Sequence, residues 1–371
     1  MGKKRPVIGI DASRAVGRIR TGTENYSAQI IRGLVSQPLD GDWRIYFNGH
    51  ADDLDLPEVP NIERRNIPAP RLWTHVRLSR ELMLHRVSGL FVPAHVVPLY
   101  HPPAVVTIHD LGYLHWPETH PKNQVRMLDL TTRWSARAAR HIIVPSQQTA
   151  NDLVGAYHVS ADKITVVHHG IDPAMKTQPD HSDTTLRERY NLPGRFVLAV
   201  GTMQPRKNLG TLAVAMALLT TEPEVHLVIA GRKGWMHDQV EKDLAAANLG
   251  DRLHILDYIP SVDLPALYRA AEIFVQPSRF EGFGMPILEA MACGTPVIAA
   301  RGSSLDEIGG DAALRFNADD ATELAFHITS LLADPAKKLA AAAAGTAWSQ
   351  VFNWEQAVRK TRIVLEESLL S

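Results

Sequence analysis

The feature that most constrains the fold is an alternation of short apolar runs with segments of helical periodicity. In the first half we expect strands at Val7–Asp11, Arg44–Phe47, Leu90–Val92, Ala104–His109, His141–Val144 and Ile164–His168. Helical stretches lie between several of them, at Glu24–Ser36, Leu72–Arg86, Asn123–Ala139 and Gln147–Tyr157. Continuous apolar strands with helical crossovers are typical of parallel sheets that are covered on both faces.

The alternation stops at a polar stretch and then restarts. Residues Asp172–Pro193 predict a linker followed by a short helix. Later strands are expected at Arg195–Val200, Val225–Ala230, Leu253–Leu256, Ile273–Gln276 and Pro296–Ala299, before a helical tail from Ala336. A chain of 371 residues suits two domains. The sequence therefore predicts an α/β protein of two doubly wound domains, with the default ligand site at the carboxyl ends of their strands.

Cysteine usage and the lack of long apolar segments bear on localisation. The single cysteine, Cys293, excludes a disulfide framework and is typical of a reducing cytoplasm. The basic start, Met1–Arg5, leads straight into a strand, so we expect no secretory signal. No stretch approaches the ~20 apolar residues that span a bilayer. We expect a cytoplasmic protein that is soluble or bound to a surface.

The net charge of −1 hides an asymmetry between the two halves. Residues 1–150 carry 19 Lys and Arg against 13 Asp and Glu, whereas the remainder carries 20 against 27. Either the basic half meets an anionic surface or ligand, or both halves are simply solvated. We expect no nucleic-acid partner.

The segment from Ser278 to Met291 carries the strongest chemical signal. It follows the strand Ile273–Gln276 and precedes a helix that starts near Pro286. Its glycines allow close approach of a ligand to the backbone, and a helix start offers free N–H groups to an anion. Glu281 precedes the helix and Glu289 lies about one turn into it. A phosphate bound there would have one carboxylate on each side.

This segment resembles the Glu-x7-Glu signature of the large retaining family of GT-B glycosyltransferases, of the family 4 (group 1) type, which includes many bacterial mannosyltransferases. The resemblance covers nearly the whole chain and also takes in Ile108–Leu111, Val200–Leu209 and Ala230–Trp235. It implies two facing Rossmann-like domains, with a C-terminal helix crossing back. The implied bounds are an acceptor-binding domain at 1–170, a linker at 171–194, a nucleotide-sugar-binding domain at 195–350 and the crossing helix at 351–371.

The resemblance implies roles for residues of the second domain. Glu281 would lie beside the donor sugar, and Glu289 would accept hydrogen bonds from the ribose hydroxyls. Stabilisation of the helix dipole is the alternative role for Glu289. The remaining implied contacts to the nucleotide sugar come from Gly231, Tyr258, Gly282, Phe283, Gly284 and Met285.

The resemblance implies that the turn at Gly201–Asn208 supplies cations for the leaving nucleoside diphosphate. Fixed cations and helix N-termini can neutralise its developing charge without a metal, so we expect no metal and no cofactor. Lys207 matches the family's phosphate-binding lysine. Many members have an arginine where this chain has Thr202, and we expect Arg206 to replace it. An exposed basic turn is the alternative.

His109 ends a strand of the first domain, at the edge that faces the expected cleft. Family members place a histidine here against the donor sugar, so the resemblance implies a catalytic role. A structural histidine is the alternative. His168 and His169 are the next candidates.

The turn after the first strand is not Gly-x-Gly-x-x-Gly, which disfavours a nicotinamide dehydrogenase. Thr21 and Glu24 have capping-box spacing, which predicts a helix start. In the resembling enzymes this loop closes over the diphosphate, with Gly22 as the close-approach glycine; a plain helix start is the alternative. Asp53-Leu54-Asp55 has the form of a metal-binding Asp-x-Asp, but it lies in a polar loop and we discount it. No P-loop string occurs.

The acceptor is less constrained than the donor. Residues Arg71–Arg86 are a candidate basic amphipathic helix, which predicts either peripheral contact with the anionic inner face of the plasma membrane or ordinary packing in the core. Related enzymes build lipid-linked glycans, so the resemblance implies a glycan or lipid-linked acceptor in cell-surface polysaccharide synthesis. Strings at Pro205–Asn208 and Lys233–Trp235 resemble those of mannosyltransferases, which favours GDP-mannose or a GDP-deoxymannose. The alternatives are a nucleotide-sugar epimerase and a catalytically silent scaffold.

Overall fold

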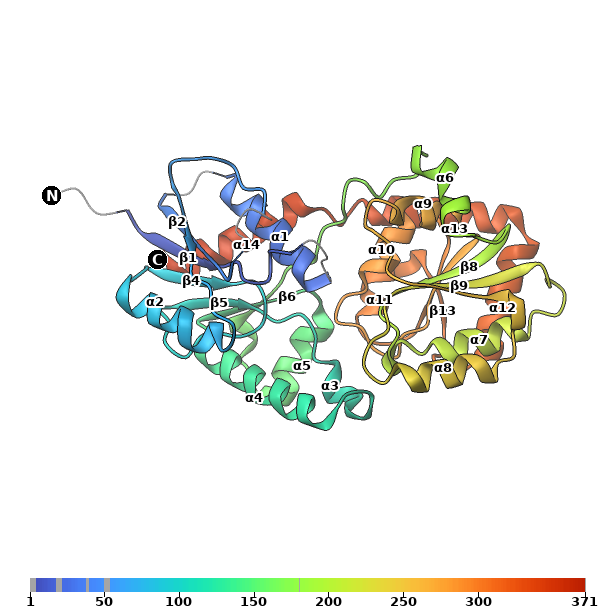
Figure 1. Cartoon of the computed structure of the whole chain (residues 1–371), viewed down its shortest axis with the longest axis horizontal. Coiled ribbons are helices and arrows are strands. Elements are labelled where there is room, and N and C mark those ends of the chain that lie inside the picture. Colours follow the sequence, from blue (N-terminus) through green and yellow to red (C-terminus); the bar gives the residue numbers. More distant parts are fainter. Residues whose placement is uncertain (1–4, 18–21, 38–39, 50–53, 180, 371) are drawn as a thin grey trace. The chain divides into compact units, whose positions relative to one another are not determined.

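The computed structural model describes residues 5–17, 22–37, 40–49, 54–179 and 181–370. They form two compact units (Figure 1). The first unit comprises residues up to Leu111, Arg126–Gly170 and the segment from Asn353 onward. The second comprises Gly112–Val125 and Ile171–Phe352.

The first unit is built on a seven-stranded sheet in which all neighbouring strands are parallel. Its order is β3 (Ile62–Asn66), β2 (Asp42–Phe47), β1 (Val7–Asp11), β4 (Gly89–Val92), β5 (Ala104–Thr107), β6 (His141–Val144) and β7 (Ile164–Val166). Its helical segments are α1 (Gly22–Val35), the π-helix η2 (Trp73–Leu78), α2 (Ser79–Leu84), α5 (Gln147–Tyr157), η4 (Ala161–Lys163), α14 (Trp354–Leu369) and most of α4 (Lys122–Ala138).

The last helix, α14, completes the first unit, as the resemblance implied. It packs against α1 and lies along β4, β5 and β6. The contact with α1 is close, because a Cβ added at Gly33 would lie 2.2 Å from a methyl of Val358. Asn353 caps the helix by accepting a hydrogen bond from the N–H of Gln356 (2.9 Å).

The second unit contains a six-stranded parallel sheet. Its order is β10 (Leu253–Leu256), β9 (Val225–Ala230), β8 (Arg195–Val200), β11 (Ile273–Gln276), β12 (Val297–Ala300) and β13 (Leu314–Phe316). Its helical segments are α3 (Gly112–His115), η3 (Pro117–Thr119), α6 (His181–Arg189), η5 (Pro205–Lys207), α7 (Leu209–Ala217), α8 (His237–Ala246), η6 (Gly250–Arg252), α9 (Leu264–Ala270), α10 (Met285–Ala292), α11 (Ser304–Gly309), η7 (Gly310–Ala312), α12 (Ala321–Ala333) and α13 (Pro335–Ser349).

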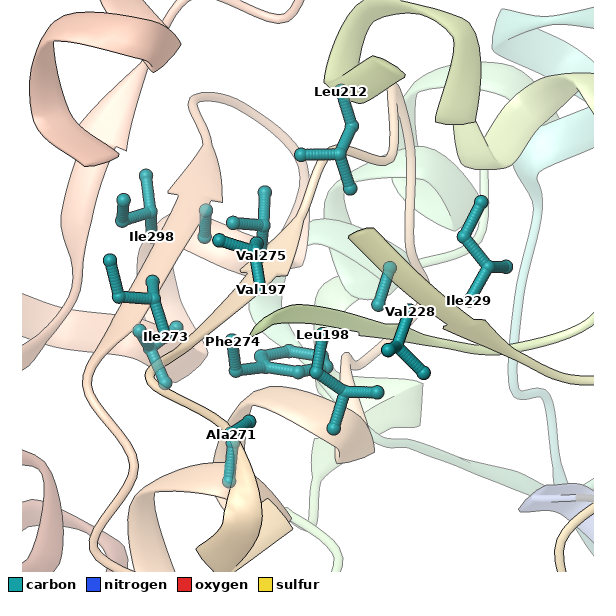
Figure 2. Packing of buried hydrophobic residues seen from close by; sticks show 14 of the residues in the cluster. Val197, Leu198, Leu212, Val228, Ile229, Ala271, Ile273, Phe274, Val275 and Ile298 are labelled. Carbon is teal, nitrogen blue, oxygen red and sulfur yellow. The ribbon is translucent and has the colours of Figure 1, made fainter. Parts of the chain in front are cut away.

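Helices cover both faces of this second sheet: α9, α10 and α13 lie on one face, and α7, α8 and α12 on the other (Figure 1). The strands are apolar on both faces, which such a two-sided cover requires. Figure 2 shows Val197, Phe274 and Val275 among the buried side chains of this core.

The polar stretch after Gly170 is anchored to the second unit. Asp263, at the start of α9, accepts hydrogen bonds from Arg189 (2.9 Å) and from the hydroxyl of Tyr190 (2.7 Å). Arg269 pairs with Asp183 of α6. These contacts place α6 against α9.

Candidate functional site

The loops that carry the predicted donor residues meet at one edge of the second sheet. The strand order reverses between β8 and β11, which pair directly, and ligands of doubly wound sheets bind at such a switch point. The turn after β8 and the loop after β11 both begin at this edge. A small cavity here is lined by Gly201, Lys207, Gln276 and Ser278.

Three of the predicted catalytic residues form one ionic cluster at this edge. Arg206 Nη1 lies 3.0 Å from Glu281 Oε2, and Lys207 Nζ lies 2.6 Å from Glu281 Oε1. Both cations come from η5, and Arg206 also donates to the carbonyl of Phe280. Two cations share one carboxylate, so the cluster has an excess positive charge.

Glu281 is buried, and the cluster keeps it ionised. Burial opposes ionisation of its carboxyl group, but the charges of Lys207 and Arg206 outweigh burial and lower its pKa to about 2. An ion pair taken out of water costs desolvation energy, which close geometry must offset. Glu281 is therefore a carboxylate at any physiological pH.

Further residues hold Glu281 in place, and our sequence analysis did not predict them. Gln276, the last residue of β11, donates to Glu281 Oε1 and to Ser278 Oγ, both at 2.8 Å. Ser304 donates to the backbone carbonyls of Glu281 (2.8 Å) and Phe283 (2.9 Å). For Gln276, the sequence clue was that a polar residue ends an otherwise apolar strand, which suggests a side chain used at the site.

Glu289 lies on the helix that follows the Glu281 loop. It accepts a hydrogen bond from the hydroxyl of the fully buried Tyr268, at 2.7 Å. Burial raises the pKa of Glu289, the Tyr268 bond lowers it and the Asp172 charge raises it further. Glu289 is the fifth residue of α10, beyond the first turn where the helix dipole acts most strongly.

The glycine-rich loop is shaped by its packing. Gly284 has a φ of 104°, and a Cβ there would lie 2.9 Å from Leu305 Cδ2. Gly282 and Phe283 are buried, with the Phe283 ring packed edge-on against Phe352. The Phe283 side chain thus belongs to the core. Helix α10 begins directly after this loop, at Met285.

The other predicted donor-site residues lie on neighbouring turns. A Cβ at Gly231 would be 2.0 Å from the carbonyl oxygen of Gly201, so these two backbones touch. Tyr258 is partly exposed, and the guanidinium of Arg232 lies 4.4 Å from its ring centroid. Thr202 is exposed.

His109 belongs to the first unit and is buried just beyond β5. Its Nε2 lies 2.7 Å from the carbonyl oxygen of Pro93, which can only accept, so Nε2 carries the proton. Its Nδ1 is buried and has no hydrogen-bond partner among the described residues. Burial lowers the pKa of His109 to about 4, against the opposing effect of the Pro93 bond. The rings of Tyr26 and His169 pack around it, at 4.7 and 5.5 Å.

Other predictions lie partly outside the described residues. Gly22 begins α1 and is exposed, with open space where a Cβ would point. Arg18–Thr21 before it, Asp53 of the Asp-x-Asp string and Met1–Lys4 lie outside the described residues. Within the described ranges, no group of three or more His, Cys, Asp or Glu side chains could hold a metal ion, and no helix is both long and apolar enough to cross a bilayer.

Known proteins resemble both halves of the chain. The family model described as Glycosyl transferases group 1 matches residues 183–348, and the model of Glycosyltransferase Family 4 matches residues 20–175. The O-antigen chain mannosyltransferase B of Escherichia coli is 33% identical over 261 residues, which are 70% of this chain and 68% of that protein.

A second relative and a solved structure extend the comparison. The D-inositol 3-phosphate glycosyltransferase of Xylanimonas cellulosilytica is 33% identical over 234 residues, covering 59% of this chain and 55% of that protein. The crystal structure of Anabaena HepE in complex with UDP-glucose matches with a TM-score of 0.75 at 19% identity, covering 98% of this chain and 99% of that chain. The whole described fold is therefore shared with a GT-B protein. From the two family models and the Escherichia coli relative, the chain belongs to glycosyltransferase family 4, the group 1 glycosyl transferases, and is a glycosyltransferase of GT-B fold.

Proposed function

We propose that this enzyme transfers mannose or a deoxymannose from a GDP-sugar, with retention of configuration, to a glycan or lipid-linked acceptor in cell-surface polysaccharide synthesis. The observation that carries the proposal is the cluster of Arg206, Lys207 and Glu281 at the switch point of the second sheet. The name of the Escherichia coli relative, an O-antigen chain mannosyltransferase, supports the choice of sugar and pathway.

The cluster suits the departure of a nucleoside diphosphate. The Lys207 ammonium has three donors, of which Glu281 takes one, so the others can bind phosphate oxygens. Fixed cations stabilise charge that develops on a leaving group without reorganising during the reaction. In our proposal Lys207 neutralises the diphosphate, Arg206 holds Glu281, and a phosphate oxygen takes the proton of the acceptor. No metal is required.

The remaining site residues would bind the rest of the donor. Glu289 would accept hydrogen bonds from the ribose hydroxyls, with Tyr268 fixing its orientation. The backbone of Gly231 packs directly on the carbonyl of Gly201, which fixes the two neighbouring turns against each other. The resemblance would place His109 against the donor sugar, and its low pKa keeps its imidazole neutral at pH 7.

The test is a transfer assay with purified protein. GDP-mannose, UDP-glucose and ADP-glucose are each offered with a mannosyl oligosaccharide, a polyprenyl-diphosphate glycan or inositol 3-phosphate, and products are read by mass spectrometry and NMR. We expect transfer from GDP-mannose to a glycan acceptor, at a rate unchanged by EDTA. Transfer only to inositol 3-phosphate would contradict the proposed glycan or lipid-linked acceptor. Loss of activity in EDTA would contradict the metal-free mechanism. Donor epimerisation without an acceptor would favour the epimerase.

We also propose that the first unit contacts an anionic membrane. In the segment predicted as a basic amphipathic helix, Trp73, Leu78 and Leu82 are buried in the core. The same segment also exposes apolar and basic side chains: Leu72, Val76, Met83 and Leu84, with Arg71, Arg80 and Arg86. This combination of apolar and cationic side chains suits an anionic lipid surface.

Vesicle sedimentation tests this contact. Phosphatidylglycerol vesicles should bind the protein in a salt-sensitive way, and serine substitutions at Leu72, Val76 and Met83 should weaken that binding. Leu339→Ser, at an equally exposed apolar residue of the second unit, is the matched control. The proposed membrane contact would be contradicted if the protein did not bind the vesicles, or if Leu339→Ser weakened binding as much as the substitutions at Leu72, Val76 and Met83.

A further inference from the structure

The segment Gly112–Val125, called the strap below, follows closely on His109 but belongs to the second unit. One anchor of the strap is Trp235, whose indole Nε1 donates to the carbonyl of Thr119 at 2.6 Å. The ring of Trp235 also packs on His120, with centroids 5.3 Å apart. A side chain in the loop before α8 therefore holds the middle of the strap.

A second anchor lies beside the Glu281 loop. The imidazole of His115 stacks on Phe280, with centroids 4.7 Å apart and planes at 21°. The guanidinium of Arg279 lies 5.2 Å from the Trp116 ring. The strap thus contacts both residues that directly precede Glu281.

Those two residues are also hydrogen-bonded to Arg206 in the turn Gly201–Asn208, called the cation turn below. The N–H of Arg279 donates to the carbonyl of Arg206 at 3.0 Å, and Arg206 Nη1 donates to the carbonyl of Phe280. The Glu281 loop therefore lies between η5 and the strap. A displacement of Phe280 would change the geometry of the Arg206–Glu281 pair.

The strap does not pack continuously on the rest of the second unit. A cavity of about 460 Å³ is lined by Trp116 and Thr119 of the strap, by Pro205 and Asn208 of the cation turn, and by Arg279. Because the cavity leaves the strap unsupported there, the contacts with Trp235 and Phe280 carry more of its attachment.

We propose that Trp235 is a positioning residue of the donor site, which acts through the strap to hold Phe280 and thereby Glu281. This inference rests on the proposed role of the Glu281 cluster in sugar transfer. It assigns a function to a segment that contains none of the predicted site residues.

Trp235→Phe tests the proposal because it keeps an aromatic ring against His120 but removes the indole donor. Loss of this hydrogen bond should lower kcat about fivefold while changing the KM for the donor little. The matched control is Trp348→Phe, which removes an equivalent bond, from Trp348 Nε1 to the carbonyl of Ile308 (2.8 Å), elsewhere in the second unit. We expect the control to retain its kcat.

Hydrogen exchange provides a readout that does not need any sugar donor. In Trp235→Phe, amides of residues 112–125 and 279–283 should exchange faster than in the wild type, whereas in Trp348→Phe they should not. His115→Ala removes the other anchor, and its effect on kcat should be less than additive with Trp235→Phe, because both act through one strap.

Three results would overturn the proposal: unchanged exchange at residues 279–283, equal loss of kcat in both tryptophan variants, or full additivity with His115→Ala. If the wild-type protein transferred no sugar but Trp235→Phe still raised exchange at residues 279–283, the strap would stand as a support of this loop and the proposed function would fail instead.

Discussion

At the scale of single residues, the burial of Glu281 between two cations limits the chemistry available to it. A carboxyl group with a pKa of about 2 cannot donate a proton at neutral pH and is a poor base. It is therefore suited to accepting hydrogen bonds, and in our proposal it places negative charge beside the sugar. Lys207 and Arg206 lower the pKa of Glu281 and, in our proposal, also contact the diphosphate. A change at one of these three residues should therefore alter the electrostatics of the other two.

Lys207→Ala should reduce kcat by about 100-fold, the usual cost of removing one donor that stabilises a leaving oxyanion. Arg301→Ala is the control, because Arg301 forms an exposed ion pair with Glu323 in the same unit (2.8 Å). Steady-state kinetics and thermal unfolding would be measured together. A normal kcat in Lys207→Ala, or an equal loss in both variants, would contradict the role of Lys207.

The buried His109 should make stability depend on pH. Its pKa of about 4 lies below the 6.5 of the unfolded chain, so the unfolded state takes up a proton first as the pH falls. Its contribution, about 3 kcal/mol at most, is therefore present above pH 6.5 and lost between pH 6.5 and 4. Urea unfolding at several pH values should show a weaker pH dependence in His109→Gln than in the wild type. An identical slope in both proteins would show that His109 is not buried in its neutral form.

The predicted site residues differ in how much the sequence revealed of them. Arg206, Lys207 and Glu281 lie in short strings with a recognisable pattern, and the structure brings the three together. The hydrogen bonds from Gln276 and Ser304 depend on how the Glu281 loop folds, and only the polar end of an apolar strand hinted at Gln276.

At the scale of elements, apolar patterning was sufficient for the buried strands. The expected bounds of β1, β6, β8, β9, β10 and β11 agree with the structure. Two strands were missed. β3 is an edge strand with the sequence Ile-Glu-Arg-Arg-Asn, whose charges suit an unpaired edge but hide the strand pattern, and β13 has only three residues. We expected the strap to belong to the domain at residues 1–170, but it packs with the second unit. Local patterns do not reveal this, because contacts such as that of Trp235 with Thr119 join residues far apart in the sequence.

Helix α1 offers a test in which packing and helix propensity have opposite effects. Gly33→Ala should gain about 0.5–1 kcal/mol from propensity but lose more, because its Cβ would lie 2.2 Å from Val358 of α14. We expect a net loss of about 1–2 kcal/mol. Gly155→Ala in α5 has open space around its Cβ and should stabilise by about 0.5–1 kcal/mol.

Urea unfolding of the two variants checks this pair. Stabilisation by Gly33→Ala would mean that α14 does not pack closely on α1, whereas opposite signs for the two variants would support the contact.

At the scale of the whole molecule, the two hydrophobic cores differ in which parts of the chain contribute to them. Among the described residues, the buried core of the second unit runs from Met175 to Phe352, whereas that of the first combines Ile8–Val167 with Ala357–Leu369 of α14. The predicted site residues other than Gly22 and the predicted catalytic His109 belong to the second unit.

Nucleoside diphosphate should therefore stabilise the second unit directly. GDP at about 100 times its Kd should raise the free energy of unfolding of this unit by about 2.7 kcal/mol. Hydrogen exchange resolved by peptide would show slower global exchange across residues 195–350, with a smaller change in β1–β3. Protection confined to the first unit would contradict the assignment of the donor site.

The position of α14 in the chain has a consequence for synthesis on the ribosome. Its side chains complete the core beneath β4–β6, yet they emerge only after the roughly 180 residues that make up the second unit. At 5–20 residues per second, the nascent first sheet waits about ten to forty seconds for its last helix. The later-made unit can thus reach its native state before the earlier one, the reverse of the usual order from the N-terminus, and the waiting apolar surface is a natural client for chaperones.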